Sequence, residues 1–148
     1  IRDSSTSRGL GDVYKRQVAL TLAKVLGLNT ASTNSPFSDI SSSSKYAGAV
    51  TALYKKGIFT GDENRKFNPN SALTREEMAK ILTVAYNLKD NGRGIQFRDV
   101  AVKHWANGYI KALSANKVTL GIGNNEYGAK NYVTHTQLAT FIERAKNN

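Results

Sequence analysis

The sequence predicts an all-helical fold built from tandem helix-loop-helix repeats, and three observations lead to that prediction. The chain overlaps with itself, without a gap, when it is shifted by sixty residues. Apolar residues in each repeat recur at i, i+3, i+4 and i+7, a spacing that gives an α-helix one buried face. Two of the expected helices also begin with capping-box sequences. Because one helix pair cannot bury its apolar faces alone, the repeats are expected to pack on one another.

Residues 1–17 differ from everything that follows, since they are polar, aperiodic and lack an initiating methionine. The string resembles translated adapter or vector sequence at the ends of assembled reading frames. We therefore predict a non-native or disordered segment that buries little surface. No apolar run approaches the roughly 20 residues that span a bilayer, and the start carries no signal-peptide core, which leaves secretion open.

Residues 18–34 are interpreted as the C-terminal helix of a truncated repeat, followed by a linker. The helix is expected near residues 17–27, because its apolar residues coincide with those of a later helix after the sixty-residue shift. We expect Leu22 and Val25 to pack against the later repeats.

The two complete repeats cover residues 35–90 and residues 95–147, the second being divergent. Each is expected to hold a first helix, a structured turn region and a second helix. The second helices carry the capping boxes, Thr74 with Glu77 and Thr134 with Gln137. The expected helices run near 44–56, 74–87, 104–115 and 134–146.

Arg75 raises the question of function. An arginine in the first turn gains nothing from the helix dipole, whose positive end prefers acidic side chains. We interpret Arg75 as a cation beside exposed helix-start N–H groups, where both would meet one carboxylate. The alternative is a solvated surface arginine. His135 takes the equivalent position in the last repeat and can act as a cation only when protonated.

Composition limits the function further. The 148 residues carry a formal net charge of +10, which favours anionic partners. The absence of cysteine excludes thiolate metal sites and cysteine nucleophiles, and the presence of only two histidines argues against a histidine-rich metal site. We expect no cofactor and no metal.

The ordered combination of "FSDI" and "FRDV", "KKGIFTG", "FNPN" and "LTREE" resembles the S-layer homology domain. That resemblance implies a pseudo-threefold bundle that holds an exported bacterial surface protein noncovalently on the cell wall, or in the S-layer, by gripping a secondary cell wall polysaccharide that is often pyruvylated. It also implies fusion to another surface domain, with no membrane insertion and no enzyme activity of its own.

The resemblance implies that Arg75 binds the acidic sugar, and His135 stands in its place in the other repeat. Trp105 could cover apolar sugar edges, or it could anchor its helix in the core. Asp39 and Asp99 could bond sugar hydroxyls, or they could cap the turns that follow them.

Two other classes of function compete with this one. A basic chain of helix pairs can imitate a helix-turn-helix, so nucleic-acid binding is the alternative function. The long inter-helix connection and the lack of a dense basic helix face argue against it, so no nucleic-acid partner is expected. Asp99, His104 and His135 could be imagined as catalytic, but the sequence carries no nucleophile motif.

Overall fold

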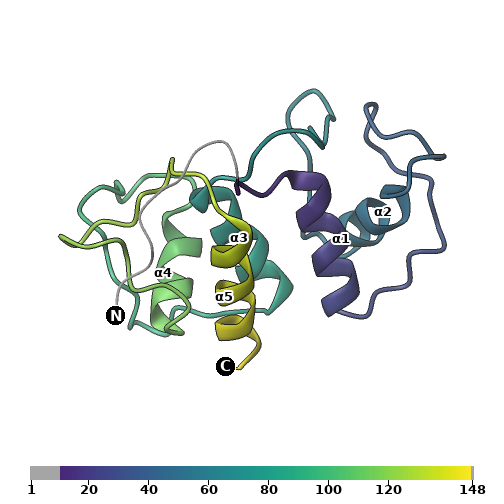
Figure 1. Cartoon of the computed structure of the whole chain (residues 1–148). Coiled ribbons are helices and arrows are strands. Elements are labelled where there is room, and N and C mark those ends of the chain that lie inside the picture. The colour runs from purple at the N-terminus through teal and green to yellow at the C-terminus, as the bar shows by residue number, and fades with distance from the viewer. Residues whose placement is uncertain (1–10, 148) are drawn as a thin grey trace. The chain divides into compact units, whose positions relative to one another are not determined.

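The structure, a computed structural model, describes residues 11–147 (Figure 1), and that part of the chain is all-helical. Strand-like backbone pairing within it is confined to isolated bridges, with no β-strand. The predicted fold class is therefore confirmed. The five helices of the described range are α1 (Lys15–Val25), α2 (Ala47–Lys55), α3 (Arg75–Ala85), α4 (Asn107–Ala115) and α5 (His135–Lys146).

The first helix of each complete repeat begins three residues later than predicted, at residue 47 in place of 44 and at residue 107 in place of 104. The residues just before each start form a single turn instead. The backbone N–H of Ala47 donates to the carbonyl of Ser44, and that of Asn107 donates to the carbonyl of His104. Such bonds between residues three apart tighten the chain at a helix start and shift its assigned boundary.

The capping boxes form as predicted. In α3 the Glu77 N–H donates to Thr74 Oγ1 at 3.4 Å, while the Thr74 N–H donates to Glu77 Oε1 at 2.9 Å. In α5 Thr134 and Gln137 make the same reciprocal pair, at 3.1 and 2.9 Å. Both helix starts are thus fixed by local sequence.

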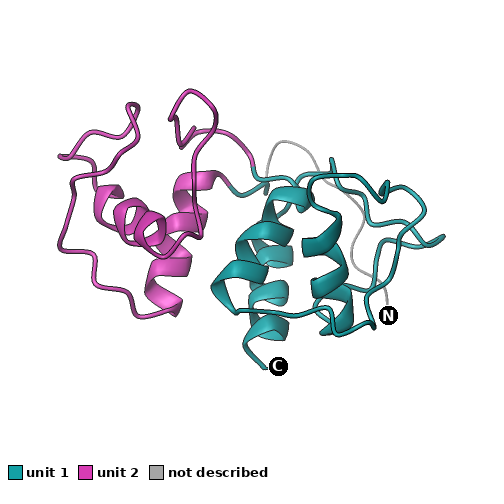
Figure 2. Ribbon diagram, turned by 180° about the vertical axis from the view of Figure 1, so that it is seen from behind, with its two compact units in different colours: residues 1–13, 73–148 teal, residues 14–72 magenta. Residues whose placement is uncertain are grey.

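The chain divides into two compact units (Figure 2): residues 14–72, and residues 1–13 with 73–148. In the first of these, which we call unit 2, α1 packs on α2. In the other, unit 1, α3 packs on α4, and α5 belongs to the same unit. The close helix pairs therefore combine the second helix of one repeat with the first helix of the next.

The truncated repeat's helix, α1, packs as predicted through Leu22, which is completely buried. The expectation for Val25 is wrong, because that side chain is 43% exposed. Val25 is the last residue of α1, so no following turn of the helix covers it. The buried face is made instead by Val18, Ala19, Leu22 and Ala23.

A cyclic set of backbone hydrogen bonds joins three buried residues of unit 1. The N–H of Val13 donates to the carbonyl of Val133, Val133 to Leu73, and Leu73 back to Val13, at 2.9, 2.8 and 3.0 Å. The three residues are spaced by sixty in the sequence and are at most 1% exposed. Each repeat thus contributes one residue to a three-way contact, as expected for a pseudo-threefold arrangement.

Val13 lies in the segment that the sequence predicted to be non-native or disordered. Contrary to the expectation that residues 1–17 bury little, Asp12 and Val13 are buried, and Lys15 opens α1. Residues 1–10 lie outside the described part of the chain. The cyclic set of hydrogen bonds explains why this segment is buried. Val13 donates its N–H to the last repeat, and its carbonyl accepts an N–H from the first complete repeat.

Candidate functional site

Arg75, the first residue of α3, points into unit 1 and is fully buried. Its Nε donates to the carbonyl of Tyr127 at 2.7 Å, and its Nη2 lies 3.4 Å from Thr119 Oγ1. The guanidinium carbon lies 4.4 Å from the ring centroid of Tyr127 and 5.3 Å from that of Phe141. The expected solvent-facing position is therefore wrong, since two aromatic faces and a carbonyl hold the cation inside.

The start of α3 is not open to an anion either. The N–H of Arg75 donates to the carbonyl of Asn131 at 2.8 Å, and that of Glu76 donates to the carbonyl of Ala129 at 2.9 Å. The loop of the following repeat thus occupies the donors that were expected to face a carboxylate. This corrects the prediction of exposed N–H groups beside Arg75.

Asp39 and Asp99 are placed alike in the two repeats. Asp39 accepts the N–H groups of Phe67 and Asn68 at 2.9 and 2.8 Å. Asp99 accepts those of Tyr127 and Gly128 at 2.8 and 2.9 Å. Each carboxylate therefore ties the start of its repeat to a turn region 28 and 29 residues further along, rather than capping the turn that directly follows it.

Trp105 differs from these residues because its side chain is 53% exposed. It stands two residues before α4, next to His104, whose ring stacks on it at a centroid distance of 5.8 Å and an interplanar angle of 25°. Tyr109 approaches it edge-on at 6.5 Å. These two neighbours flank the indole and leave part of it open to solvent.

His104 connects the indole to α3. Its Nδ1 accepts the N–H of Ala106 at 2.9 Å, so the proton of the neutral ring resides on Nε2. Nε2 lies 3.0 Å from Oε1 of Glu76. The imidazole is thereby fixed between the turn that precedes α4 and the first turn of α3.

Glu76 is buried and its second oxygen, Oε2, accepts from Lys130 Nζ at 3.0 Å. The Lys130 side chain is 82% exposed, so an ammonium group stands at the surface above a buried carboxylate. We call the group of Glu76, His104, Trp105 and Lys130 the Trp105 surface. It combines an open aromatic face with an exposed cation that a buried carboxylate holds in place, a set that suits an anionic ligand with an apolar face.

Of the predicted site residues, only Trp105 belongs to this surface. His135 is exposed at the start of α5, where its N–H donates to the carbonyl of Gly11. Within residues 11–147, no hydrogen bond or ion pair joins His135 to Asp99 or His104, so these three residues form no catalytic constellation.

The sequence did not single out Glu76 or Lys130. Glu76 looked like an ordinary acidic residue in a first turn, where the helix dipole favours it. Its spacing to His104 and Lys130 has no local periodicity, because the contact is made between one repeat and the next. One signal was present, since "HW" and "REE" fall at the two helix starts that pack together.

Metal sites and membrane spans can be judged for residues 11–147. They contain no group of three or more His, Cys, Asp or Glu side chains gathered as a metal site would need. None of their helices has the length and apolarity required to cross a membrane.

A comparison with protein-family models matches the S-layer homology domain at residues 36–79 and 96–139. The two matched ranges begin at equivalent places in the two complete repeats and end inside α3 and α5. They leave the truncated first repeat unmatched.

Among curated proteins, the chain is 31% identical over 140 residues to an Exoglucanase XynX of Acetivibrio thermocellus, covering 88% of this chain and 12% of that protein. It is 40% identical over 86 residues to the Surface-layer 125 kDa protein of Lysinibacillus sphaericus, covering 57% of this chain and 7% of that protein. An S-layer protein of Bacillus thuringiensis subsp. finitimus is 26% identical, covering 90% of this chain and 16% of that protein. The chain thus spans a small part of each relative, and the match to a named exoglucanase assigns no catalytic activity to this chain.

Proposed function

Because the chain belongs to the S-layer homology domain family, we propose that it holds an exported bacterial surface protein on the cell wall by binding an anionic, pyruvylated wall polysaccharide. The family and the S-layer relatives support cell wall anchoring as the general function, with the chain at the bacterial surface. The anchored protein would include a further domain fused to these repeats, since the chain covers only 7 to 16% of those relatives.

The proposed contact site is the Trp105 surface, and the half-exposed indole of Trp105 is the observation that carries this proposal. A sugar ring presents apolar C–H faces and polar edges, so an open indole can cover a face while polar groups meet the hydroxyls. Buried Glu76 acts indirectly, because its two oxygens hold His104 beside the indole and Lys130 at the surface.

Lys130 supplies the preference for an anion. Its ammonium group is exposed and reaches Glu76 along a flexible stem, so it can turn toward a ligand carboxylate. The net charge of +10 adds long-range attraction for an acidic polymer. A ketal-linked pyruvate would provide the carboxylate that this cation meets.

Arg75 takes a positioning role in this proposal. Its side chain bonds the carbonyl of Tyr127 and its backbone N–H bonds that of Asn131, so both ends of the segment that carries Lys130 are tied to the start of α3. Asp99 holds the same segment through Tyr127 and Gly128. These contacts fix where Lys130 stands without touching the sugar.

His135 and Asp39 take ancillary roles in this proposal. His135 is exposed at the start of α5 and could meet an acidic sugar once protonated. Asp39 would act, like Asp99, by holding its own turn region through two backbone N–H groups.

The proposal can be tested by calorimetry with the wall polymer released by hydrofluoric acid, before and after mild acid hydrolysis of its pyruvyl ketals. We expect the Trp105→Ala variant to bind the intact polymer about tenfold more weakly, as removal of a contacting aromatic side chain typically does. Val102→Ala is the matched control, because Val102 is a 75% exposed apolar residue three positions before Trp105.

Loss of binding after ketal hydrolysis would support the pyruvylated ligand, whereas equal binding before and after would contradict it. Equal affinities of the Trp105→Ala and Val102→Ala variants would remove the Trp105 surface from the proposal. A duplex DNA titrated in parallel covers the nucleic-acid alternative, and tighter binding to DNA than to polymer at physiological salt would favour that alternative.

A further inference from the structure

The sequence contains two Asn–Gly pairs, Asn91–Gly92 and Asn107–Gly108, and the structure places them in very different surroundings. Glycine has no side chain to shield its backbone nitrogen from the amide carbon of the preceding asparagine. When that nitrogen attacks the carbon, the two residues close a succinimide ring. Ring closure in a folded protein depends on the freedom of the backbone and on the hydrogen bonds that hold the amide.

Asn91 and Gly92 form the exposed centre of a turn in the linker between the two complete repeats. The N–H of Arg93 closes the turn by donating to the carbonyl of Asp90 at 3.1 Å, and the N–H of Gly94 donates to Asp90 Oδ1 at 2.6 Å. Both central residues have positive φ, 55° for Asn91 and 78° for Gly92. Within residues 11–147 neither of them makes a hydrogen bond, so no contact restrains the asparagine amide or the glycine nitrogen.

Asn107, in contrast, is held at the start of α4 and is only 9% exposed. Its Nδ2 donates to Oε1 of Gln96 and to the carbonyl of Val102, at 3.1 and 3.3 Å. Its Oδ1 accepts from Nε2 of Gln96 at 3.1 Å. The helical backbone also fixes ψ of Asn107, so the nitrogen of Gly108 cannot rotate toward the side-chain carbon unless the helix start opens.

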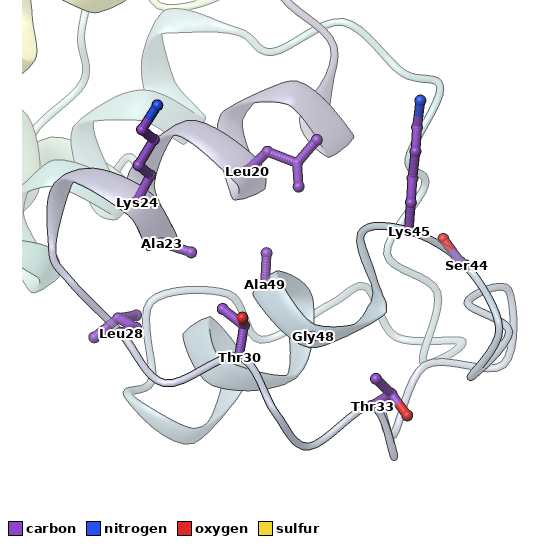
Figure 3. Close-up of a pocket in the computed structure, with 10 residues that line it drawn as sticks. All are labelled: Leu20, Ala23, Lys24, Leu28, Thr30, Thr33, Ser44, Lys45, Gly48 and Ala49. Carbon is purple, nitrogen blue, oxygen red and sulfur yellow. The ribbon is translucent and has the colours of Figure 1, made fainter.

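The corresponding linker of unit 2 lacks this chemistry and packs differently. Under the sixty-residue shift Asn91 coincides with Ala31, which has no amide to react. Figure 3 shows Thr30 of that linker beside Gly48 of α2, and a Cβ on Gly48 would lie 2.2 Å from the Thr30 carbonyl oxygen. A Cβ on the equivalent Gly108 would meet no heavy atom of the described residues within 4 Å. The turn at Asn91 therefore does not press on the start of its helix.

We propose that Asn91 is a site of spontaneous deamidation, which slowly modifies the joint between the two complete repeats. The Gly92 nitrogen forms a bond to Asn91 Cγ, the Cγ–Nδ2 bond breaks, and ammonia leaves with the proton of the Gly92 N–H. One water molecule then opens the succinimide. Cleavage at Cγ gives aspartate, and cleavage at the main-chain carbonyl gives isoaspartate, whose backbone runs through the former side chain. No oxidant or reductant takes part, and the proposal does not depend on the proposed function.

The isoaspartyl product would alter a segment that is tied at both ends to the C-terminal part of α4. Before the turn, the carbonyl of Lys89 accepts from Asn116 Nδ2 at 2.8 Å. After the turn, the N–H of Ile95 donates to Ser114 Oγ at 2.7 Å. Isoaspartate adds one backbone atom between these two contacts, and either product adds a negative charge next to Asp90. The hydrogen bonds that close the turn are therefore expected to weaken, because they must absorb the extra length.

Incubation of the full chain in ¹⁸O-labelled water at mildly alkaline pH, followed by peptide mapping in ordinary water, tests the proposal. Trypsin separates the two pairs into peptides 90–93 and 104–111, each with one asparagine. We expect peptide 90–93 of the folded chain to gain solvent oxygen as a mixture of aspartate and isoaspartate. Peptide 104–111 should convert at least about tenfold more slowly, since its helix start must open first. In guanidinium chloride the two peptides should convert at similar rates.

Three results would each overturn the proposal: equal conversion of both peptides in the folded chain, no conversion of Asn91, or aspartate without isoaspartate. Gly92→Ala places a methyl group beside the attacking nitrogen and should slow the conversion several-fold. Circular dichroism checks that this variant folds, because Gly92 has a φ of 78°. If it does not fold, the comparison of the two peptides in the parent chain still decides.

Asn91→Asp separates the added charge from the added backbone atom. Incubated chain that carries isoaspartate, identified by its acceptance of a methyl group from an isoaspartyl methyltransferase, should exchange the amide hydrogens of Gly94 and Ile95 several-fold faster than the parent. Asn91→Asp should exchange them at the parent's rate. Unchanged exchange in the isoaspartyl chain would contradict the predicted loosening of the joint, and equal acceleration in Asn91→Asp would assign it to charge alone and contradict the role of the extra atom.

Discussion

Replacing Arg75 by alanine should destabilise unit 1, whereas the sequence alone predicts an intact fold and a lost ligand contact. The reason is the position of the side chain, which is fully buried between the rings of Tyr127 and Phe141. The substitution would remove that packing and leave the carbonyl of Tyr127 without the Nε donor at 2.7 Å. Both effects lower the free energy of unfolding.

The magnitude follows from the contacts. A hydrogen bond from a charged donor contributes about 1.5 to 3 kcal/mol, and a desolvated cation–π contact about 2 kcal/mol. Truncating a large buried side chain adds the cost of a cavity. Because the variant also escapes the desolvation cost of a buried guanidinium, we expect a net loss of about 3 kcal/mol. For a chain of this size that corresponds to a fall in Tm of roughly 10 °C.

Unfolding by guanidinium chloride, followed by circular dichroism, measures the free energy of unfolding of the Arg75→Ala, Arg75→Lys and Arg75→Met variants. Lysine keeps the charge and loses the planar fork, so its stability should fall between those of the parent and the alanine variant. Methionine fills part of the volume without polar contacts and separates packing from bonding. Lys103→Ala is the control, since Lys103 is an exposed cation in the same unit.

The structural role of the side chain would be refuted if the free energy of unfolding of Arg75→Ala lay within about 0.5 kcal/mol of the parent's, as it does for most surface substitutions. A ten- to hundredfold loss of polymer affinity in such a stable variant would restore Arg75 as a direct anion contact. A loss of affinity only in proportion to the unfolded fraction would leave it a positioning residue.

Three further predictions concern contacts in the two units. Asp99→Ala removes the acceptor of two backbone N–H groups and should lower the free energy of unfolding by about 2 kcal/mol. Urea titration measures this loss, and Asp99→Asn should recover part of it. An unchanged urea midpoint would contradict the role assigned to the carboxylate. Val13→Asp places a charge in the buried cyclic set of backbone hydrogen bonds and should destabilise unit 1 by several kcal/mol. An unchanged Tm in thermal unfolding would mean that the truncated repeat does not stabilise this contact. Leu22→Asp should likewise unfold the α1–α2 pair, seen as loss of NMR amide dispersion within residues 14–72, while Val25→Asp, at a 43% exposed position, should leave it folded.

Acid titration offers one more check, on the turn region of the first complete repeat. The backbone N–H of Lys66 and the side-chain amide of Asn68 bond the Asp62 carboxylate and hold its pKa below the ordinary value of 3.8. A lowered pKa in the folded state means stability that is present at neutral pH and is lost as the pH falls below about 4. Asp62→Asn should therefore flatten the acid limb of the stability curve, and an acid limb identical to the parent's would contradict this.

The elements of the fold could be predicted from local sequence. Helix positions followed from apolar periodicity, and the starts of α3 and α5 followed from Thr74 and Thr134 with their partners three residues on. These features are local, since the interacting residues are three or four apart and each helix fixes its own geometry. The ordered motifs within the sixty-residue repeat indicated the family, and that resemblance implied a pseudo-threefold bundle, in which equivalent residues take equivalent places.

The location of the chemistry, in contrast, depends on contacts between distant segments of the chain. Arg75 stands off the apolar stripe of α3 and looked solvent-facing, but Tyr127 comes from a loop 52 residues away and encloses it. The same loop brings Lys130 to Glu76, 54 residues apart, and closes the helix start that seemed open to an anion. Burial of a polar side chain depends on what the next repeat lays over it, and no spacing within one helix carries that information, because the covering residues are far away in the sequence.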